Sequence, residues 1–274
     1  MVPFRARTST TVPRSVDKSR REGGRLGTWG VRLLVLGFWL LVWQVAASAI
    51  NARIILVGPL DVLARLCALV TTGEFWASVG VSLARIAVGF ALAVMSGVLL
   101  AAVASRVRVV RVLLEPLMGV MKAVPVASFV ILVLLWVSSS YLSVVIAFVM
   151  ALPIVYTNVL EGIRQTDPQL LEMCQVFGVG TLERVRLVYA SQVLPYFRAA
   201  VSLALALSWK AGIAAEVIGL PDYTIGEHLY DAKVYLDTPD LFAWTVAIVI
   251  VSVALDTLMN RALDLVAVRW EARP

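Results

Sequence analysis

Apolar residues gather into six long runs that are separated by shorter polar segments. The runs cover Val31–Ile50, Val79–Val103, Leu113–Val137, Tyr141–Leu160, Ala199–Leu220 and Leu241–Leu258. Each run has, or nearly has, the ~20 residues that a helix needs to cross the hydrocarbon core of a bilayer. Helices are expected rather than strands, because an open sheet edge would leave unpaired backbone groups in lipid. The pattern predicts an all-α polytopic membrane protein with about six transmembrane helices.

The segment 1–28, before the first run, is polar and rich in arginine. We expect it to form a disordered cytoplasmic tail, with residues 29–274 forming a single transmembrane domain. A cleaved signal peptide is the alternative for the first run, since Ala47, Ser48 and Ala49 supply small residues where cleavage would occur. However, the basic segment and the apolar run are both longer than in usual signal peptides. We therefore expect the first run to be retained.

The composition agrees with a surface that lipid covers. Hydrophobic residues make up 60% of the 274 positions and charged residues 15%, with a mean hydropathy of +0.88. Soluble domains are about 45–50% apolar and about 25% charged, so a soluble fold could not bury this much apolar surface. The net charge of +6 does not indicate nucleic acid, because the basic residues lie at the ends of the apolar runs rather than in one patch. Cys67 and Cys174 are too few and too far apart for a disulfide framework or a metal cluster.

Basic residues are unevenly shared between the two sets of loops. With a cytoplasmic N-terminus, most of the 24 lysines and arginines lie in the tail, in the loops after the second and fourth runs, and in the C-terminal segment. Only Arg53, Arg65 and Lys233 lie in loops on the opposite side. Because cytoplasmic loops carry the excess of basic residues, we predict that both termini are cytoplasmic.

The loop between the fourth and fifth runs, residues 161–190, has its own helix signals. Asp167 is a favourable N-cap, and the proline after it suits the first helical position. Leu170, Cys174 and Phe177 then fall on one face at helical spacing, and Gly178 can end the helix. A second helix start follows at Thr181. A short loop helix with an apolar face is what a docking partner would bind.

This loop resembles the cytoplasmic loop of ABC-importer permeases. Their pattern is Glu-Ala-Ala, three residues, Gly, nine residues, an aliphatic residue, one residue, then Leu-Pro. Glu172, Gly178 and Val188 match it. The chain departs from it at Met173 and Cys174, and at Ala190-Ser191, where Leu-Pro is expected. Leu194-Pro195 matches a second Leu-Pro of the nitrate/sulfonate/taurine branch.

Further fragments resemble the same branch, in the same order, across nearly the whole chain. They are Ser82-Leu83, Arg85, Gly89-Phe90, Glu115-Pro116, Ala123-Val124-Pro125, Glu161-Gly162-Ile163-Arg164, Ala215-Glu216 and Ile225-Gly226. The resemblance implies a type I importer permease in a bacterial cell membrane, with spans two to six as its core. It also implies a dimer, usually of identical permeases, that binds cytoplasmic ATP-binding subunits and an external substrate-binding protein, which is periplasmic or lipid-anchored.

The resemblance assigns coupling to the ATP-binding subunit to the loop helix. The residues concerned are Asp167, Leu170, Leu171, Glu172, Cys174, Phe177 and Gly178. The chain itself has no Gly-x-x-x-x-Gly-Lys-Ser/Thr phosphate loop, so ATP is expected on the partner subunit and no cofactor on this chain. We expect a transport subunit rather than an enzyme, with lipid around it and no nucleic acid as a partner.

Ionisable residues inside the apolar runs are costly in lipid, so each is a candidate for function. Lys122 lies shortly before Pro125 in the third run, and broken helices at membrane depth usually line a cavity. Lys122, Pro125 and Ser128 are therefore candidates for the translocation pathway. Arg85 begins a stripe of small residues that favours close helix packing, and it either reaches the interface, fixes a helix pair or takes part in gating.

The fifth run holds two further candidates. Glu216 ends a stripe of small residues at four-residue spacing, which places it on a packed face, where it serves either a gate or the structure. Lys210 is six residues earlier and rotated by about 120°, so the two are not expected to pair. Lys210 either contacts the pathway or stabilises the bundle.

The span charges leave one positive charge in excess, because Arg85, Lys122 and Lys210 stand against Glu115 and Glu216. This favours a small anionic solute, and the resemblance suggests an organic, sulfonate-like or nitrate-like one. A stand-alone ion-coupled secondary transporter is the alternative function. Such carriers usually show inverted repeats, which the chain does not display, and this alternative leaves the loop helix unexplained. A membrane enzyme would need clustered His, Asp or Cys residues at one membrane face, and none is evident.

Overall fold

The computed structural model describes residues 24–50, 52 and 54–271, and all of its regular structure is helical. The chain divides into two units, residues 1–51 and 52–274. The first unit contributes one described helix, α1 (Gly24–Ile50). This helix begins inside the segment assigned above to a tail, and the rest of that segment lies outside the described residues. Residues Gly30–Ile50 of α1 are long and apolar enough to cross a membrane.

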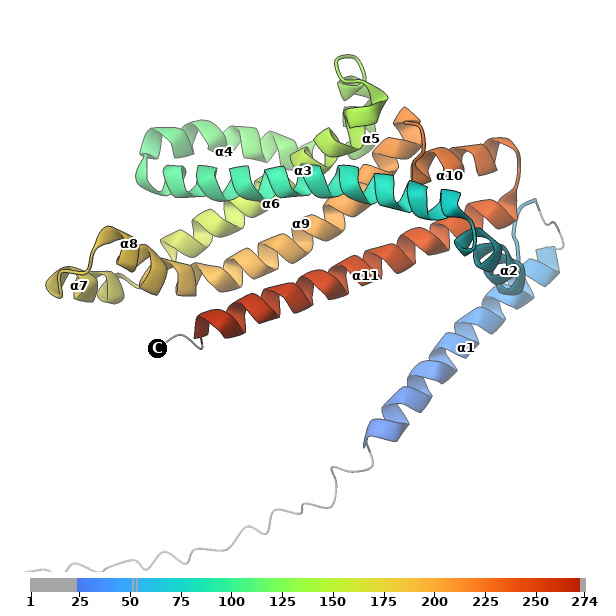
Figure 1. Ribbon diagram of the computed structural model, residues 1–274, viewed down its shortest axis with the longest axis horizontal. Helices are drawn as coiled ribbons and strands as arrows, with labels where there is room; N and C mark the ends of the chain where they lie inside the picture. Colours follow the sequence, from blue (N-terminus) through green and yellow to red (C-terminus); the bar gives the residue numbers. More distant parts are fainter. Residues whose placement is uncertain (1–23, 51, 53, 272–274) are drawn as a thin grey trace, which may run out of the picture. The chain divides into compact units, whose positions relative to one another are not determined.

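The second unit is a bundle of long helices with shorter ones at its ends (Figure 1). Its helices are α2 (Pro59–Val70), α3 (Gly73–Arg106), α4 (Arg108–Ala123), α5 (Val126–Val133), α6 (Ser139–Arg164), α7 (Pro168–Val176), α8 (Thr181–Arg184), α9 (Ala190–Gly219), α10 (Ile225–Val234) and α11 (Thr238–Glu271). A π-helical turn, Val185–Tyr189, joins α8 to α9. The helix α10 was not expected from the sequence.

Five helical stretches among the described residues could each cross a membrane, and α4 with α5 forms a sixth candidate that is broken. The two parts of this broken span are bent by 106°. The third run, Leu113–Val137, is therefore broken near Pro125, as expected, and its first helix begins earlier, at Arg108. Proline lacks a backbone N–H and pushes the residue before it out of the helical region. Val124 accordingly has an extended backbone, with φ −69° and ψ 126°.

Small residues allow α6 to pack closely between α3 and α9. A Cβ atom on Gly89 would lie 2.2 Å from the carbonyl oxygen of Val144 in α6, and one on Gly97 would lie 2.9 Å from Val155. On α9, a Cβ atom on Gly212 would lie 2.5 Å from Ile86 of α3. The stripes of small residues on α3 and α9 are thus confirmed as packing surfaces. Close backbone approach of this kind is how helices associate in lipid.

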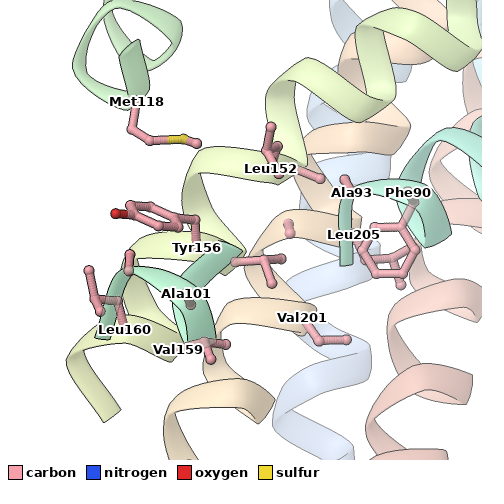
Figure 2. Close-up of a cluster of buried hydrophobic side chains, with 14 of the residues drawn as sticks. Phe90, Ala93, Ala101, Met118, Leu152, Tyr156, Val159, Leu160, Val201 and Leu205 are labelled. Carbon is pink, nitrogen blue, oxygen red and sulfur yellow. The ribbon is translucent and has the colours of Figure 1, made fainter. Parts of the chain in front are cut away.

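A cluster of buried apolar side chains fills the space beside this contact, and Figure 2 shows its members from α3, α4, α6 and α9. Phe90, Ala93 and Ala101 come from α3, Met118 from α4, Leu152, Tyr156, Val159 and Leu160 from α6, and Val201 and Leu205 from α9. This cluster connects the α4–α6 face with the α9 side of the bundle. The three central helices therefore act as one packed body on which the loop helices are mounted.

The two ends of the second unit differ in charge and in secondary structure (Figure 1). The end with α7 and α8 also holds the basic C-terminal end of α3 and the start of α4. The opposite end holds α2 and α10, where the Arg65 side chain bonds Asp240 of α11 at 2.8 Å. This hydrogen bond raises the pKa of the Arg65 guanidinium. The short helix α2 begins at Pro59 and buries Val62 and Leu66 on one side.

Candidate functional site

The loop helix α7 begins at the residues expected from the sequence. The Asp167 carboxylate accepts a hydrogen bond from the Gln169 N–H at 2.8 Å, and Pro168 occupies the first helical position. The Asp167 N–H donates to the side-chain oxygen of Gln192 in α9 at 2.9 Å. The start of α7 is thus held both by its own cap and by the helix that follows the loop.

Gly178 ends α7 in the left-handed region, at φ +66°. The Val179 N–H donates to the Cys174 carbonyl at 2.8 Å, and the Gly178 N–H donates to the Gln175 carbonyl at 3.1 Å. These two bonds form a Schellman motif, which satisfies carbonyls that the helix end would leave free. A side chain at position 178 would meet no other atoms within 4 Å. The requirement for glycine is therefore one of backbone conformation and not of space.

The side chains of α7 point in two directions. Cys174 is buried and Leu170 and Leu171 are half-buried, whereas Glu172 is exposed. Phe177 is 77% exposed, so the expectation that it shares the face of Leu170 and Cys174 is wrong. The reason is that Phe177 is the C-cap, at φ −83° and ψ 3°, where the chain is already leaving the helix. The predicted apolar face packs toward the protein itself.

A second apolar surface of the loop points outward, and the sequence analysis missed it. It consists of Met173, Val176, Phe177 and Leu182, which are between 49% and 83% exposed. We call this set the loop surface. Apolar residues three positions apart at 173 and 176, on a different side of the helix from Leu170 and Cys174, were the signal that could have indicated it. Exposed apolar side chains gathered on a capped helix are typical of a docking site.

Charged and polar side chains line a second region, on facing sides of α4 and α6. A cavity of about 390 Å³ is lined by Arg111, Glu115, Met118, Tyr156, Thr157, Leu160, Glu161 and Arg164. The Lys122 ammonium donates to the Thr157 hydroxyl at 3.1 Å, one turn farther along α4 than Met118. We call this region the polar face. Three of its charges are basic and two acidic, which leaves one positive charge in excess.

The six intramembrane candidates fall into two groups. Lys122, Pro125 and Ser128 are exposed around the α4–α5 break, and Lys210 is exposed on α9. Glu216, by contrast, is fully buried, so Lys210 and Glu216 do not share a face of α9. Arg85 is half-buried, and one of its guanidinium nitrogens is enclosed with no partner among the described residues. The structure thus separates exposed lysines from an enclosed acidic group.

Glu216 belongs to a junction of three helices. The Ser82 hydroxyl of α3 donates to its carboxylate at 2.7 Å, and the Ile225 N–H of α10 donates to the same hydroxyl at 3.0 Å. A Cβ atom on Gly226 would lie only 2.3 Å from the Cβ of Glu216, so α10 approaches α9 closely here. Three of the sequence fragments that resemble the permease branch, Ser82-Leu83, Ala215-Glu216 and Ile225-Gly226, therefore meet at this junction. Their distance from one another along the chain gave no indication of this contact.

Much of the chain is similar to a known protein family. Residues 89–271 match the family described as binding-protein-dependent transport system inner membrane component. The chain belongs to this family. It is the permease component of an ABC importer, an inner-membrane protein of the type I permease fold. The match covers the polar face, the loop surface, and the Glu216 and Ile225 side of the junction, whereas Ser82 lies before it.

Curated relatives extend the similarity to nearly the whole chain. The putative aliphatic sulfonates transport permease protein SsuC of Bacillus subtilis (strain 168) is 23% identical over 97% of this chain and 98% of its own. The bicarbonate transport system permease protein CmpB of Synechococcus elongatus is 26% identical over 87% of this chain and 93% of its own. The riboflavin transport system permease protein RibX of Chloroflexus aurantiacus is 28% identical over 95% and 96%.

Membership in this permease family implies an ATP-binding partner and a substrate-binding partner, because the family serves binding-protein-dependent transport. Among the described residues, no group of three or more His, Cys, Asp or Glu side chains could hold a metal ion.

Proposed function

We propose that this permease docks its ATP-binding subunit through the loop surface and passes a small anionic solute along the polar face of a homodimer. The observation that carries the proposal is the exposed apolar surface of α7, on a helix capped at both ends. Apolar side chains that are 77% and 83% exposed, such as Phe177 and Val176, would otherwise face water. An ATP-binding subunit that covers them gains the burial of this surface.

The loop is built to transmit movement from such a partner. The Asp167–Gln192 bond joins the start of α7 to α9, and the π-helical turn joins α8 to α9 without a flexible segment. On the other side, Gly162 near the end of α6 packs against Tyr196 of α9, since a Cβ atom there would lie 3.0 Å from the ring. Displacing α7 should therefore displace the paired ends of α6 and α9 together.

The polar face supports the pathway and the homodimer. The Lys122–Thr157 contact lies about 10 Å along α6 from its end at Arg164, which is within the apolar span. A charged face at this depth is costly against lipid, so it requires water or protein opposite it. A second copy of the permease, placed against α4 and α6, would enclose the face and form a water-filled path between the copies.

An anionic solute fits the exposed lysines. Lys122 and Lys210 are exposed within their helices, whereas the acidic Glu216 is enclosed and hydrogen-bonded. The net field that a solute meets is therefore positive. The names of the relatives include aliphatic sulfonates, bicarbonate and nitrate, which are anions, and also riboflavin. We propose an organic sulfonate-like or nitrate-like anion, delivered by an external binding protein.

The proposed orientation places both termini and the α7–α8 end in the cytoplasm. That end holds Arg106, Arg108, Arg164, Arg184 and Arg186 among the described residues, whereas the opposite end holds Arg65 and Lys233. Basic residues are enriched on the cytoplasmic side. The same orientation exposes the loop surface to a cytoplasmic ATP-binding subunit, which binds the ATP, so no cofactor is proposed on this chain.

The experiment that tests the docking proposal is co-purification of the permease with the ATP-binding subunit of its transport system. We expect Val176→Asp and Phe177→Asp to reduce the recovered ATP-binding subunit by about tenfold or more, as is usual for apolar anchors at the centre of an interface. Tyr235→Asp is the matched control, because Tyr235 is 79% exposed and lies at the opposite end of the bundle. This control should recover as much partner as the wild type.

Normal recovery and normal transport with Val176→Asp and Phe177→Asp would contradict the docking proposal. If the wild type recovered no ATP-binding subunit and yet transported solute in proteoliposomes with only an ion gradient, the alternative of a secondary transporter would replace it.

A further inference from the structure

A groove runs along the bundle between α3 and the segment formed by the π-helical turn and α9. Its larger part has a volume of about 560 Å³ and is almost entirely apolar, with Val94, Val98 and Leu99 of α3, Val159 of α6, and Val193 and Phe197 of α9 in its walls. Its smaller part has a volume of about 280 Å³ and is lined by Ser105, Arg106, Ile163, Arg164, Val185 and Tyr189. The docking and pathway proposals use neither cavity, although Arg164 lines both the smaller part and the polar face.

The two parts form one continuous feature, because the same three segments line both in matching order. On α3 the lining continues from Val98 through Ala102 to Arg106 in four-residue steps, which keeps to one face of a helix. On α6 it continues from Val159 to Ile163. The opposite wall passes from Val193 of α9 to Tyr189 of the π-helical turn.

The length of the groove matches one leaflet of a bilayer. Val94 comes twelve residues before Arg106 on α3, which is about 18 Å of helix. Half of the hydrocarbon core is about 15 Å thick. The two parts together therefore extend from the basic end of the bundle to about the middle of the membrane, and the apolar part, from Val94 to Leu99, is the deeper portion, about 8 Å long on α3.

The charge of the groove is concentrated at one end. Arg106 and Arg164 are the last residues of α3 and α6, and no acidic side chain lines the smaller part. Arg164 forms a surface ion pair with Glu161 at 3.9 Å, and such exposed pairs compete only weakly with a bound phosphate for the guanidinium group. Among the described residues, Arg106 has no ion pair. Two guanidinium groups beside the hydroxyls of Ser105 and Tyr189 suit a phosphate group.

We propose that this groove binds one anionic phospholipid, with its phosphate on Arg106 and Arg164 and one acyl chain along α3 and α9. Basic pockets between transmembrane helices on the cytoplasmic side take anionic headgroups in this way. The lipid belongs to the leaflet beside α7, which the orientation proposed above makes the cytoplasmic one. Its headgroup would contact Val185 and Tyr189 of the π-helical turn, through which the loop joins α9.

The test is native mass spectrometry of the full-length permease, released from nanodiscs of phosphatidylglycerol and phosphatidylcholine in equal parts. We expect the wild type to retain one phosphatidylglycerol in preference to phosphatidylcholine, and Arg106→Ala/Arg164→Ala to lose this preference by about tenfold. Arg108→Ala is the matched control, because Arg108 is exposed at the same end but lines neither part of the groove. Met95→Trp, which places a ring in the apolar part, should reduce retention of both lipids.

Equal retention of phosphatidylglycerol by the wild type and by Arg106→Ala/Arg164→Ala would overturn the proposal. A photo-reactive residue at Met95 that captured α1 or a second copy, and no lipid, would overturn it as well by showing another occupant. Neither measurement needs the ATP-binding subunit or transport, so failure of the lipid site and failure of the docking proposal are distinguishable.

Discussion

At the scale of single residues, Glu216 shows how one enclosed carboxylate joins distant segments. Its hydrogen bond from Ser82 ties α9 to α3, and the bond from the Ile225 N–H to Ser82 adds α10. Gly226 lies so close to it that no side chain would fit between. Enclosure and bonding of this kind favour the structural role over the gate, of the two roles that the sequence left open. Lys210, which is exposed on the same helix, remains a candidate for the pathway.

The first prediction concerns this junction. Ser82→Ala removes the donor to Glu216 and the acceptor of the Ile225 N–H, so we expect a loss of roughly 2 kcal/mol of stability. A lower unfolding temperature of the detergent-purified permease would show it. Ser96→Ala is the matched control, because the Ser96 hydroxyl bonds only carbonyls of its own helix, and it should change the unfolding temperature little. Equal unfolding temperatures for the two variants would contradict the prediction.

At the scale of elements, the loop between α6 and α9 combines a rigid frame with an exposed surface. Its frame comes from the Asp167 cap and from the Schellman bonds around Gly178. Its exposed surface is the loop surface defined above, whose side chains do not pack into the hydrophobic core. Binding of a partner to such a helix costs the loop little conformational entropy, because its backbone is already ordered.

The second prediction separates backbone conformation from space at two neighbouring glycines. Gly178→Ala forces a side chain into φ +66°, at a cost of about 1–2 kcal/mol, and we expect the end of α7 to fray. Gly180→Ala should be harmless, because Gly180 has φ −58° and no atoms within 4 Å of a Cβ. Hydrogen–deuterium exchange of the peptide that covers residues 167–180 measures the fraying of α7 in each variant. Equal exchange rates in the two variants would mean that the Schellman motif does not hold the helix end.

At the scale of the whole molecule, the second unit presents surfaces that require different surroundings. Apolar side chains such as Leu92 and Leu203 suit lipid, whereas the polar face does not. Met173, Val176 and Phe177 of the loop surface are apolar but lie between two candidate spans, where water or a protein partner surrounds them. A single copy in a bilayer satisfies only the first of these surfaces, which is a physical reason for assembly with partners.

The third prediction tests the charge of the proposed pathway. Lys122→Glu and Lys210→Glu reverse the field that an anion meets, so we expect uptake of the anion to fall by about tenfold or more. Lys233→Glu, at the opposite end on α10, is the matched control and should transport normally. Uptake by proteoliposomes that contain the assembled importer measures the effect, with co-purified ATP-binding subunit as a check on assembly. Unchanged uptake in both pathway variants would contradict the assigned role of the lysines.

The sequence by itself determined the class of the protein, most of its spans and the limits of α7. Apolar runs of the length of a membrane predict helices without tertiary information, because lipid leaves the backbone no other partner. The ends of α7 are set by Asp167, Pro168 and Gly178, each of which affects only a few neighbouring residues. The local sequence is therefore enough to predict where this helix begins and ends. The break at Pro125 could be predicted from the sequence for the same reason, but the angle of 106° between its two helices could not.

Only the tertiary structure decided which side chains of these helices meet and which stay outside. Helical spacing placed Phe177 with Cys174, yet one is exposed and the other buried, because burial depends on what packs against the helix. The single histidine of the chain, His228, stacks on Trp244 with ring centres 4.7 Å apart and forms a hydrogen bond with Ser78 at 2.9 Å. Contacts across 150 residues leave no local signal in the sequence, because periodicity reports only the face of a helix and not its neighbour.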